Sequence, residues 1–321
     1  MIKPKKNTEI NPSQSTHQKL LITGATGYLG QHLMGILREN CQYSLSLITR
    51  DQQKARLLYP DQTIELFEYA DIRSDLNRSD CFDCLIHLGF THDKQNYRKV
   101  AESLEATSVL FNKAKEWRIP SVINITSLNV YGLNKPPFWK EEDPLYPELP
   151  FGMAKYATEL LLQGITHSDD RINGTSLRLT ALSGGNILLN EIELIYKLIE
   201  QVLNQHQIVI YGGQQRFERL DVRDAAMAII QLLHVPSFKW NPVYNIGVGK
   251  NYSLLEISEL VLHVAKELNI HYPYNLKVEQ KEDPTAFGLD STLFREEMNW
   301  KPAFDIKEII RSVYTNKLEQ S

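Results

Sequence analysis

Cysteine is scarce in this chain. Its 321 residues include only Cys41, Cys81 and Cys84. So small and odd a set argues against the disulfide framework of secreted mini-domains and favours a reducing compartment, so we expect a cytoplasmic protein. Cys81, Cys84 and His87 resemble metal-ligand spacing, but the segment enters an expected core strand and no fourth ligand is evident. We therefore expect no metal site.

Long apolar runs and runs of one charge are also lacking. No 18-residue apolar stretch is present, so no membrane span is expected. Residues 1–18 hold no apolar segment suited to a signal peptide, and we interpret them as a disordered polar tail. The net charge is −4 and the only basic cluster lies in the first six residues, which argues against nucleic-acid binding. We expect a small-molecule substrate and allow for a homodimer.

Apolar segments alternate between strand-like and helix-like patterns, which is typical of an α/β protein with a parallel sheet covered on both faces. We predict a doubly wound Rossmann-type domain over 19–180 and a smaller α/β region, mainly for substrate, over 181–321, with some segments returning to the core. Expected strands are 20–23, 43–50, 63–71, 82–90, 121–127, 175–181 and 242–248, with short ones near 207–211 and 218–222; expected helices are 97–118, 189–205, one from Asp224, one opened by a Ser253–Glu256 capping box, and two short ones at the end.

The strongest single motif is the turn after the first strand, "TGATGYLG". Its first glycine permits a tight turn, the second lets a pyrophosphate approach the backbone, and the third lets helix and strand pack closely. The positive helix N-terminus then faces the phosphates. Because the motif follows a strand and opens a helix, it predicts a dinucleotide site formed by Gly24, Thr26, Gly27, Tyr28, Leu29 and Gly30.

The end of the second strand indicates which dinucleotide binds. It reads Ile48-Thr49-Arg50, where an NAD site would carry Asp or Glu. Arginine suits a 2′-phosphate, so we expect NADP, with NAD as the alternative because Asp51 follows directly. Asp71 and Ile72, after the third strand, are candidates for the adenine edge, although a simple strand-terminating turn also explains them.

Several segments together resemble one family. "TGATGYLG", "ADIRSD", "CLIHLGF", "SLEATSVLFNKAK", "ITSLNVYG", "PFGMAKYATEL" and "YNIGVGKNYSLLEI" are similar, in order and spacing, to the extended short-chain dehydrogenase/reductase family. This NAD(P)-dependent epimerase/dehydratase group acts mostly on nucleotide sugars. The similarity covers roughly 19–315, and it adds Leu88 of "CLIHLGF" to the expected cofactor-binding residues.

The resemblance also implies a catalytic centre with one member missing. Ser127 matches the hydroxyl that hydrogen-bonds the substrate oxygen, and Lys155 matches the lysine that binds the nicotinamide ribose and lowers a tyrosine pKa. Phe151 stands at the tyrosine position, one helical turn before Lys155, and cannot donate or accept a proton. We expect Phe151 to line the substrate pocket. Tyr156, about 140° further round the helix, should face away.

Other departures concern the substrate. The chain reads Arg178-Leu-Thr-Ala181 where the family usually has Arg-Pro-x-Asn, and Phe217-Glu-Arg219 where it usually has an Arg-Asp-Phe-type segment. Arg219 is our candidate for a substrate phosphate. Leu128-Asn129 after Ser127 provide no Asp-Glu pair for a dehydratase step, which we rank third. The leading hypothesis is an NADP-dependent oxidoreductase or epimerase acting on a hydroxyl or carbonyl carbon, and the second is an NADP-binding degenerate enzyme.

Overall fold

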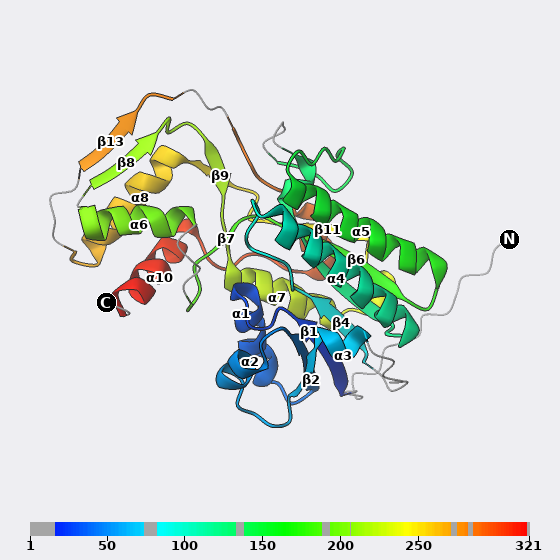
Figure 1. The fold of residues 1–321 in the computed structure, drawn as a ribbon. Coiled ribbons are helices and arrows are strands. Elements are labelled where there is room, and N and C mark those ends of the chain that lie inside the picture. The colour runs from blue at the N-terminus through cyan, green and yellow to red at the C-terminus, as the bar shows by residue number, and fades with distance from the viewer. Residues whose placement is uncertain are drawn as a thin grey trace.

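A sheet of seven parallel strands lies at the centre of the computed structural model, which describes residues 17–73, 82–132, 138–187, 193–205, 207–270, 275–281 and 285–319 (Figure 1). The spatial order is β11-β6-β5-β4-β1-β2-β3, and every pairing is parallel. The strands are β1 (Gln18–Thr23), β2 (Tyr43–Thr49), β3 (Glu65–Glu68), β4 (Cys84–His87), β5 (Ser121–Ser127), β6 (Asn173–Leu179) and β11 (Val243–Ile246).

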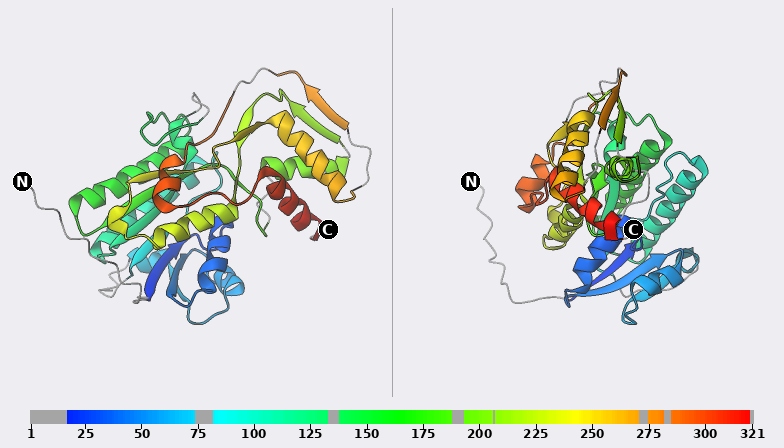
Figure 2. Two further views of the ribbon diagram at one scale, coloured as in Figure 1. Left: turned by 180° about the vertical axis from the view of Figure 1, so that it is seen from behind. Right: turned by 90° about the vertical axis from the view of Figure 1, so that its left-hand side faces the viewer.

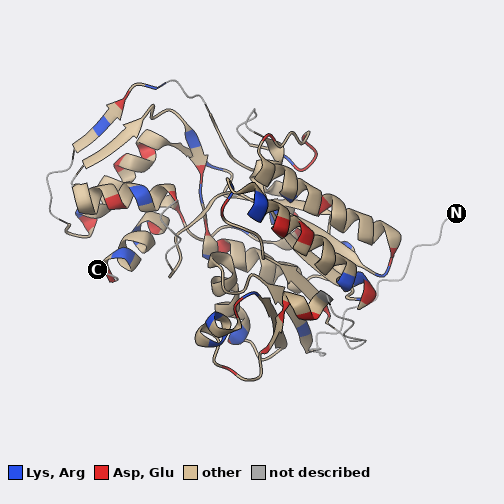
Figure 3. Cartoon of the chain, in the orientation of Figure 1, with Lys and Arg blue, Asp and Glu red and all other residues tan. Residues whose placement is uncertain are grey.

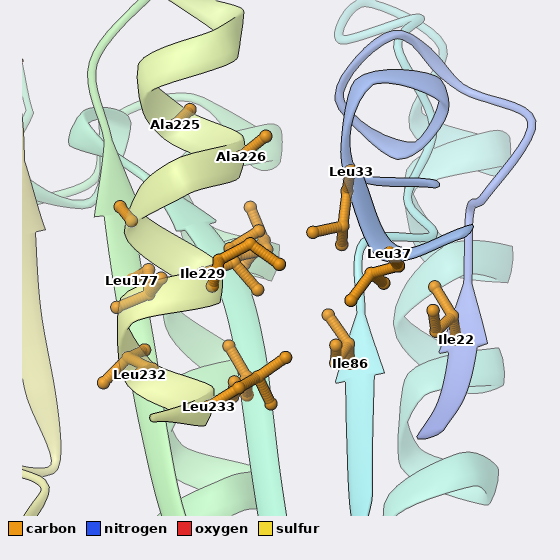
Figure 4. Packing of buried hydrophobic residues seen from close by; sticks show 14 of the residues in the cluster. Ile22, Leu33, Leu37, Ile86, Leu177, Ala225, Ala226, Ile229, Leu232 and Leu233 are labelled. Carbon is orange, nitrogen blue, oxygen red and sulfur yellow. The ribbon is translucent and has the colours of Figure 1, made fainter. Parts of the chain in front are cut away.

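Alternation along these strands divides the core into two layers. In β1, Leu20 and Ile22 join one buried cluster, whereas Leu21 joins the other. The first cluster packs under α1 (Tyr28–Arg38) and α7 (Val222–Leu233), and Figure 4 shows side chains of both helices with Ile22 and Ile86. The second packs under α4 (Tyr97–Glu116) and α5 (Pro150–Ser168). The predicted Rossmann-type, doubly wound α/β fold is therefore confirmed.

A second lobe lies to one side of the sheet and has its own core (Figure 2). It is built from α6 (Leu194–Gln205), α8 (Leu254–Glu267), α10 (Ile306–Glu319) and the parallel pair β8 (Gln207–Tyr211) and β13 (Asn275–Glu279). Shorter elements are α2 (Gln52–Leu58), α3 (Tyr69–Arg73), η1 (Leu128–Tyr131), β7 (Leu182–Ser183), β9 (Arg216–Glu218), β10 (Leu220–Asp221), η2 (Ser237–Lys239), β12 (Asn251–Ser253) and α9 (Thr292–Met298).

Several expected elements differ in extent. The third strand is not 63–71, because β3 ends at Glu68 and α3 follows directly. Asp71 therefore lies in a helix rather than at a strand end. The expected strand 218–222 is not one strand, because it contains the end of β9, all of β10 and the first residue of α7. Helix α7 begins at Val222 instead of Asp224. The capping box of Ser253 and Glu256 is confirmed at the start of α8.

The direction of the chain reverses beside β1, which fixes where a ligand can bind. From β1 the chain proceeds outward to β2 and β3, then returns to place β4 on the other side of β1. Crossovers on opposite faces leave a crevice at the carboxyl ends of these two neighbouring strands. The glycine turn and the loop after β4 both lie at this switch point.

A buried ion pair ties α5 to the sheet. Arg178 on β6 and Glu159 on α5 are 3% and 1% exposed, and two nitrogen–oxygen contacts join them at 2.7 and 3.0 Å. Thr126 donates to the same carboxylate and the Tyr131 hydroxyl accepts from the guanidinium. Arg178 stands where the resembling family has its Arg-Pro-x-Asn run. Its guanidinium is buried and paired within the fold, where it holds the helix that carries Phe151.

We predict that Arg178→Met destabilises the protein by about 3–5 kcal/mol, because Glu159 is left buried without its counter-charge. The double variant Arg178→Met/Glu159→Met should recover most of this loss, since neither charge then remains inside. Urea unfolding followed by circular dichroism measures both values. A single variant as stable as the wild type would contradict the proposed role of the pair.

Candidate active site

Neighbouring backbone lies so close to the turn on two sides that only glycine fits at Gly24 and Gly30. A Cβ on Gly24, whose φ is +71°, would lie 2.7 Å from the backbone nitrogen of Gly89 at the end of β4. A Cβ on Gly30 would lie 2.2 Å from the Gly24 carbonyl oxygen, so only glycine lets α1 pack there. Gly27 is less confined, since a Cβ there would lie 3.2 Å from the Gly24 carbonyl oxygen and its nearest side-chain neighbour would be His92 Nε2 at 3.9 Å. The second glycine therefore leaves room beside the α1 N-terminus.

Hydrogen bonds lock the ends of β1 and β4 together under this turn. Thr107 donates to the Ser103 carbonyl at 2.8 Å, so its oxygen accepts from His87 Nε2–H at 2.9 Å. His87 Nδ1 then accepts from the Thr23 hydroxyl at 2.7 Å, and the Thr23 oxygen accepts from Gly89 N–H at 3.0 Å. Burial, reinforced by Lys155, lowers the pKa of His87 to about 3, so the imidazole is neutral and serves as a structural clamp.

Tyr28 and Leu29, the two predicted cofactor residues that follow Gly27, have different surroundings. The Tyr28 hydroxyl donates to the Gly184 carbonyl at 2.5 Å, and Leu29 packs partly buried against the larger core. One turn later, His32 Nδ1–H donates to the Tyr28 carbonyl at 2.9 Å and Nε2 accepts from Asn186 N–H at 3.0 Å. The loop around Gly184 is thus anchored to α1.

Arg50 follows β2 and is exposed. Its neighbour Asp51 caps α2, accepting the backbone N–H of Lys54 at 2.9 Å. The carboxylate that could have bound ribose hydroxyls is therefore engaged in a helix cap, and the guanidinium is the group presented at this position.

The remaining predicted cofactor residues line the start of α3 and the end of β4. The Asp71 carboxylate accepts the Glu68 backbone N–H at 2.7 Å. The Ile72 side chain is 2% exposed and packs in the core, so it can offer only its backbone to a ligand. Leu88 packs partly buried, and its N–H donates to the Thr23 carbonyl at 3.2 Å, beside the glycine turn.

Ser127 terminates β5 and is half-buried. Its oxygen accepts the Asn129 N–H at 3.3 Å, which caps the short η1 helix. Its own O–H has no hydrogen-bond acceptor among the described residues, so that proton is free to be donated to a ligand oxygen.

Phe151 lies in the first turn of α5 and is 8% exposed. Its ring packs edge-to-face on Phe90, with centroids 5.8 Å apart. The loop after β4 supplies Phe90, so the phenylalanine that replaces the expected tyrosine has an aromatic partner from the opposite side of the crevice.

Lys155 lies one turn after Phe151 on α5, as the sequence predicts, and is 6% exposed. Nζ donates to the Ile125 carbonyl at 2.8 Å and sits 4.1 Å from the Phe90 ring centroid, within cation–π range. Burial lowers the pKa of Lys155 to about 7; Glu159 opposes this shift and Lys94 adds to it. The amine therefore titrates near neutrality.

Arg219 is only partly available for a substrate. Its guanidinium meets Glu193 at 3.2 Å and donates to the Glu218 carbonyl at 2.9 Å, with 10% of the side chain exposed. Arg216 is likewise engaged, by Asn251 at 2.8 Å. A contact between Arg219 and a substrate phosphate would thus require the guanidinium either to leave Glu193 or to bind the carboxylate and the phosphate together.

Sequence reasoning missed Phe90 and Lys94. Lys94 Nζ lies 4.9 Å from the Phe151 ring centroid, on the loop that follows β4. The available signal was the position of this loop at the carboxyl edge of the sheet, where ligands bind. The Lys94 residue as a whole is exposed, but its amine lies over the Phe151 ring. Desolvation of the amine, followed by repulsion from Arg219, lowers the pKa of Lys94.

Two tyrosines near the motif are committed elsewhere. Tyr131 is 1% exposed, donates to Asn245 at 2.8 Å and stacks on Trp139, so it is a packing residue. Tyr156 packs partly buried against the same small cluster. Among the described residues, no tyrosine hydroxyl hydrogen-bonds Lys155 Nζ.

No metal centre or membrane helix is found within the described ranges. No group of three or more His, Cys, Asp or Glu residues there could hold a metal ion, and Cys81 of the metal-like spacing lies outside them. None of the described helices is long and apolar enough to cross a membrane. Lys and Arg lie among Asp and Glu in both lobes (Figure 3).

The strand order, the glycine turn and the crevice at the switch point define a Rossmann-type protein of the dinucleotide-binding class. A model of the NAD dependent epimerase/dehydratase family matches residues 20–247. The chain belongs to this family.

Related proteins and structures agree with this assignment. A dTDP-glucose 4,6-dehydratase of Streptomyces niveus is 25% identical over 307 residues, 88% of each chain. A UDP-glucose 4-epimerase of Lactobacillus helveticus is 22% identical over 320 residues, 92% of this chain and 96% of the relative. The fold also matches a UDP-glucuronic acid 4-epimerase of Bacillus cereus, a tyrosine-to-phenylalanine mutant in complex with NAD and UDP-4-deoxy-4-fluoro-glucuronic acid, with TM-score 0.79, 20% identity and coverage of 95% and 100%.

We predict that the stability of the ligand-free protein rises by roughly 2 kcal/mol between pH 7 and pH 9 through Lys155 alone. The folded-state pKa is lowered, so the unfolded chain binds more protons over this range and folding gains as pH rises. His87 adds only about 0.2 kcal/mol, since its imidazole is neutral in the folded protein and already about three quarters neutral at pH 7 in the unfolded chain. Urea unfolding of wild type and Lys155→Met measures the difference.

The Lys155→Met protein should lose this rise and should be at least as stable as wild type at pH 7. His167→Gln, which changes an exposed residue further along α5, is the matched control and should keep the wild-type slope. Equal slopes in wild type and Lys155→Met would show that the amine is not held in a desolvated position.

Proposed function

We propose that the protein is an NADP-dependent oxidoreductase or epimerase that acts on a hydroxyl- or carbonyl-bearing carbon of a sugar nucleotide. The observation that carries this proposal is that Ser127 and Lys155 lie at the same edge of the sheet as the glycine turn. In that turn, a Cβ on Gly24 or Gly30 would clash with the backbone. The family and the names of the relatives support the substrate class, because those proteins are described as acting on dTDP- or UDP-sugars.

The residues present fit a dinucleotide. The open side of Gly27 and the uncapped N-terminus of α1 suit a pyrophosphate, and no acidic residue lies in the first turn of that helix to repel it. Arg50 supports a 2′-phosphate, since Asp51 is engaged in capping α2. Asp71 and the Ile72 backbone would contact the adenine, and Leu88 would flank the turn.

When bound, the cofactor would take up or return a hydride at the substrate carbon. Ser127 would donate its free O–H to the reacting oxygen. Lys155 would hold the nicotinamide ribose and add positive potential, although the amine first has to exchange its bond to the Ile125 carbonyl. Phe151 and Phe90 would exclude water from the pocket. Arg219 would reach toward the substrate phosphates.

A second candidate function rests on Phe151. A placed acid–base group contributes about 10²–10⁴ in rate, and a phenyl ring contributes none of it. The protein could then be an NADP-binding degenerate enzyme that acts as a cofactor-responsive interaction partner. The free hydroxyl of Ser127 weighs against this candidate, because cofactor binding alone does not require a hydroxyl donor there.

We predict that calorimetry finds tighter binding of NADPH than of NADH. Arg50→Gln should weaken the binding of NADPH by about tenfold, which is roughly the 1.4 kcal/mol that one exposed charge-assisted contact supplies. The affinity for NADH should stay nearly unchanged. Arg56→Gln, on the neighbouring helix α2, is the matched control and should bind both as wild type does. Tighter binding of NADH by wild type would overturn the NADP assignment.

We also predict that wild type turns over a member of a panel of dTDP- and UDP-hexoses when the cofactor is supplied. Lys155→Met should lower kcat by about 10²–10⁴ while the fold, checked by circular dichroism, is retained. If wild type binds the cofactor but shows no turnover, and Phe151→Tyr gains it, the degenerate-enzyme candidate is correct instead.

A further inference from the structure

Two amines flank the aromatic pair that replaces the expected tyrosine. Lys155 Nζ lies over Phe90 at 4.1 Å from the ring centroid, and Lys94 Nζ lies over Phe151 at 4.9 Å. The rings themselves contact edge-to-face. Two lysine amines, one from the loop after β4 and one from α5, therefore contact the aromatic pair at the position that lacks a phenol.

The position of Lys94 is set by its loop. Thr91, which is 9% exposed, accepts the Asp93 N–H at 3.2 Å, and the Lys94 N–H donates to the His92 carbonyl at 3.0 Å. Asn96 then caps α4. These local bonds fix the turn directly after β4, so Lys94 is presented at the carboxyl edge of the sheet.

The charges around Lys94 are repulsive. Arg219 faces it from the segment between β9 and β10, and Lys155 from α5, while His92 lies on the same loop. Among the described residues, no carboxylate is paired with Lys94. Desolvation and Arg219 both lower the pKa of Lys94, which increases the neutral fraction of the amine.

The two lysines differ in access. Lys155 is 6% exposed and its amine is bound to the Ile125 carbonyl, whereas Lys94 is exposed and its amine has no hydrogen-bond acceptor within the described residues. A lysine on a flexible four-carbon stem is a known type of general base when its charge is disfavoured. Lys94 is thus the more accessible of the two amines.

We propose that Lys94 carries the proton that the missing tyrosine would carry. This inference rests on the proposed function. In the oxidative direction the substrate O–H bond breaks and an N–H bond forms on neutral Lys94, which becomes an ammonium. The substrate C–H electron pair leaves to the nicotinamide, the oxidant, and a C=O bond forms. In the reductive direction the ammonium returns its proton to the oxygen.

Lys94→Met tests this inference. We expect kcat to fall by about 10²–10⁴ with KM and cofactor affinity within threefold of wild type, and the ionisation of the base to vanish from the pH–rate profile. The double variant Lys94→Met/Phe151→Tyr should have a kcat at least tenfold above that of Lys94→Met alone. Lys99→Met, which removes an exposed lysine paired with Asp93 at 3.4 Å near the same loop, should change none of these values.

A readout without turnover is NMR titration of isotope-labelled lysine side chains in the ligand-free protein. Lys94, assigned through its Lys94→Met spectrum, should titrate below the ordinary value of a lysine amine. Titration at that ordinary value, or a Lys94→Met enzyme within threefold of wild-type kcat, would overturn the inference. So would cofactor binding by wild type without turnover, whereas absence of cofactor binding by calorimetry would overturn the proposed function itself.

Discussion

The approach of the glycine turn to the end of β4 is the constraint on which the rest of the site depends. Gly24 lies so close to the backbone of Gly89 that no side chain fits between them. The clamp of Thr23, His87 and Thr107 holds the two strand ends at this separation. As a result the loop carrying Phe90 and Lys94 is directed across the crevice toward α5. A wider gap would separate the amines from the rings that they contact.

The electrostatics of the crevice follow from this geometry. Lys155 is held in an apolar, aromatic environment that disfavours its charge, and the carboxylate that could have compensated it, Glu159, is shared with Arg178. Arg219 is partly neutralised by Glu193, but Lys94 has no acidic partner in the described part of the chain. The site thus combines reactive amines with a net positive potential, which favours anionic ligands.

The sequence predicted the features that depend on local rules. The glycine turn follows a strand and opens a helix, Phe151 and Lys155 lie one turn apart on α5, and the Ser253 capping box is formed. Asp71 was misplaced because the segment after Phe67 has strand-like composition, yet a short helix begins at Tyr69. The boundary between strand and helix was decided by tertiary packing, since Ile72 enters the core.

What the sequence could not predict are contacts between distant segments. Phe90 and Phe151 are brought together only by the fold, and the pairing of Arg219 with Glu193 depends on how the second lobe packs. The anchoring of the loop at Gly184 by Tyr28 and His32 is of the same kind. None of these contacts has a signature in local spacing. The division of the chain at residue 180 stays a prediction.

The central claim is that a nicotinamide dinucleotide binds between the glycine turn and the pocket of Phe151 and Lys155. Hydrogen–deuterium exchange of the full chain, with and without NADP, tests this most directly because it reports which backbone segments a ligand protects. The account predicts protection confined to residues 24–30, 50–51, 71–72, 88–94 and the first turns of α5. Unchanged exchange in these segments, or protection elsewhere on the molecule, would contradict it.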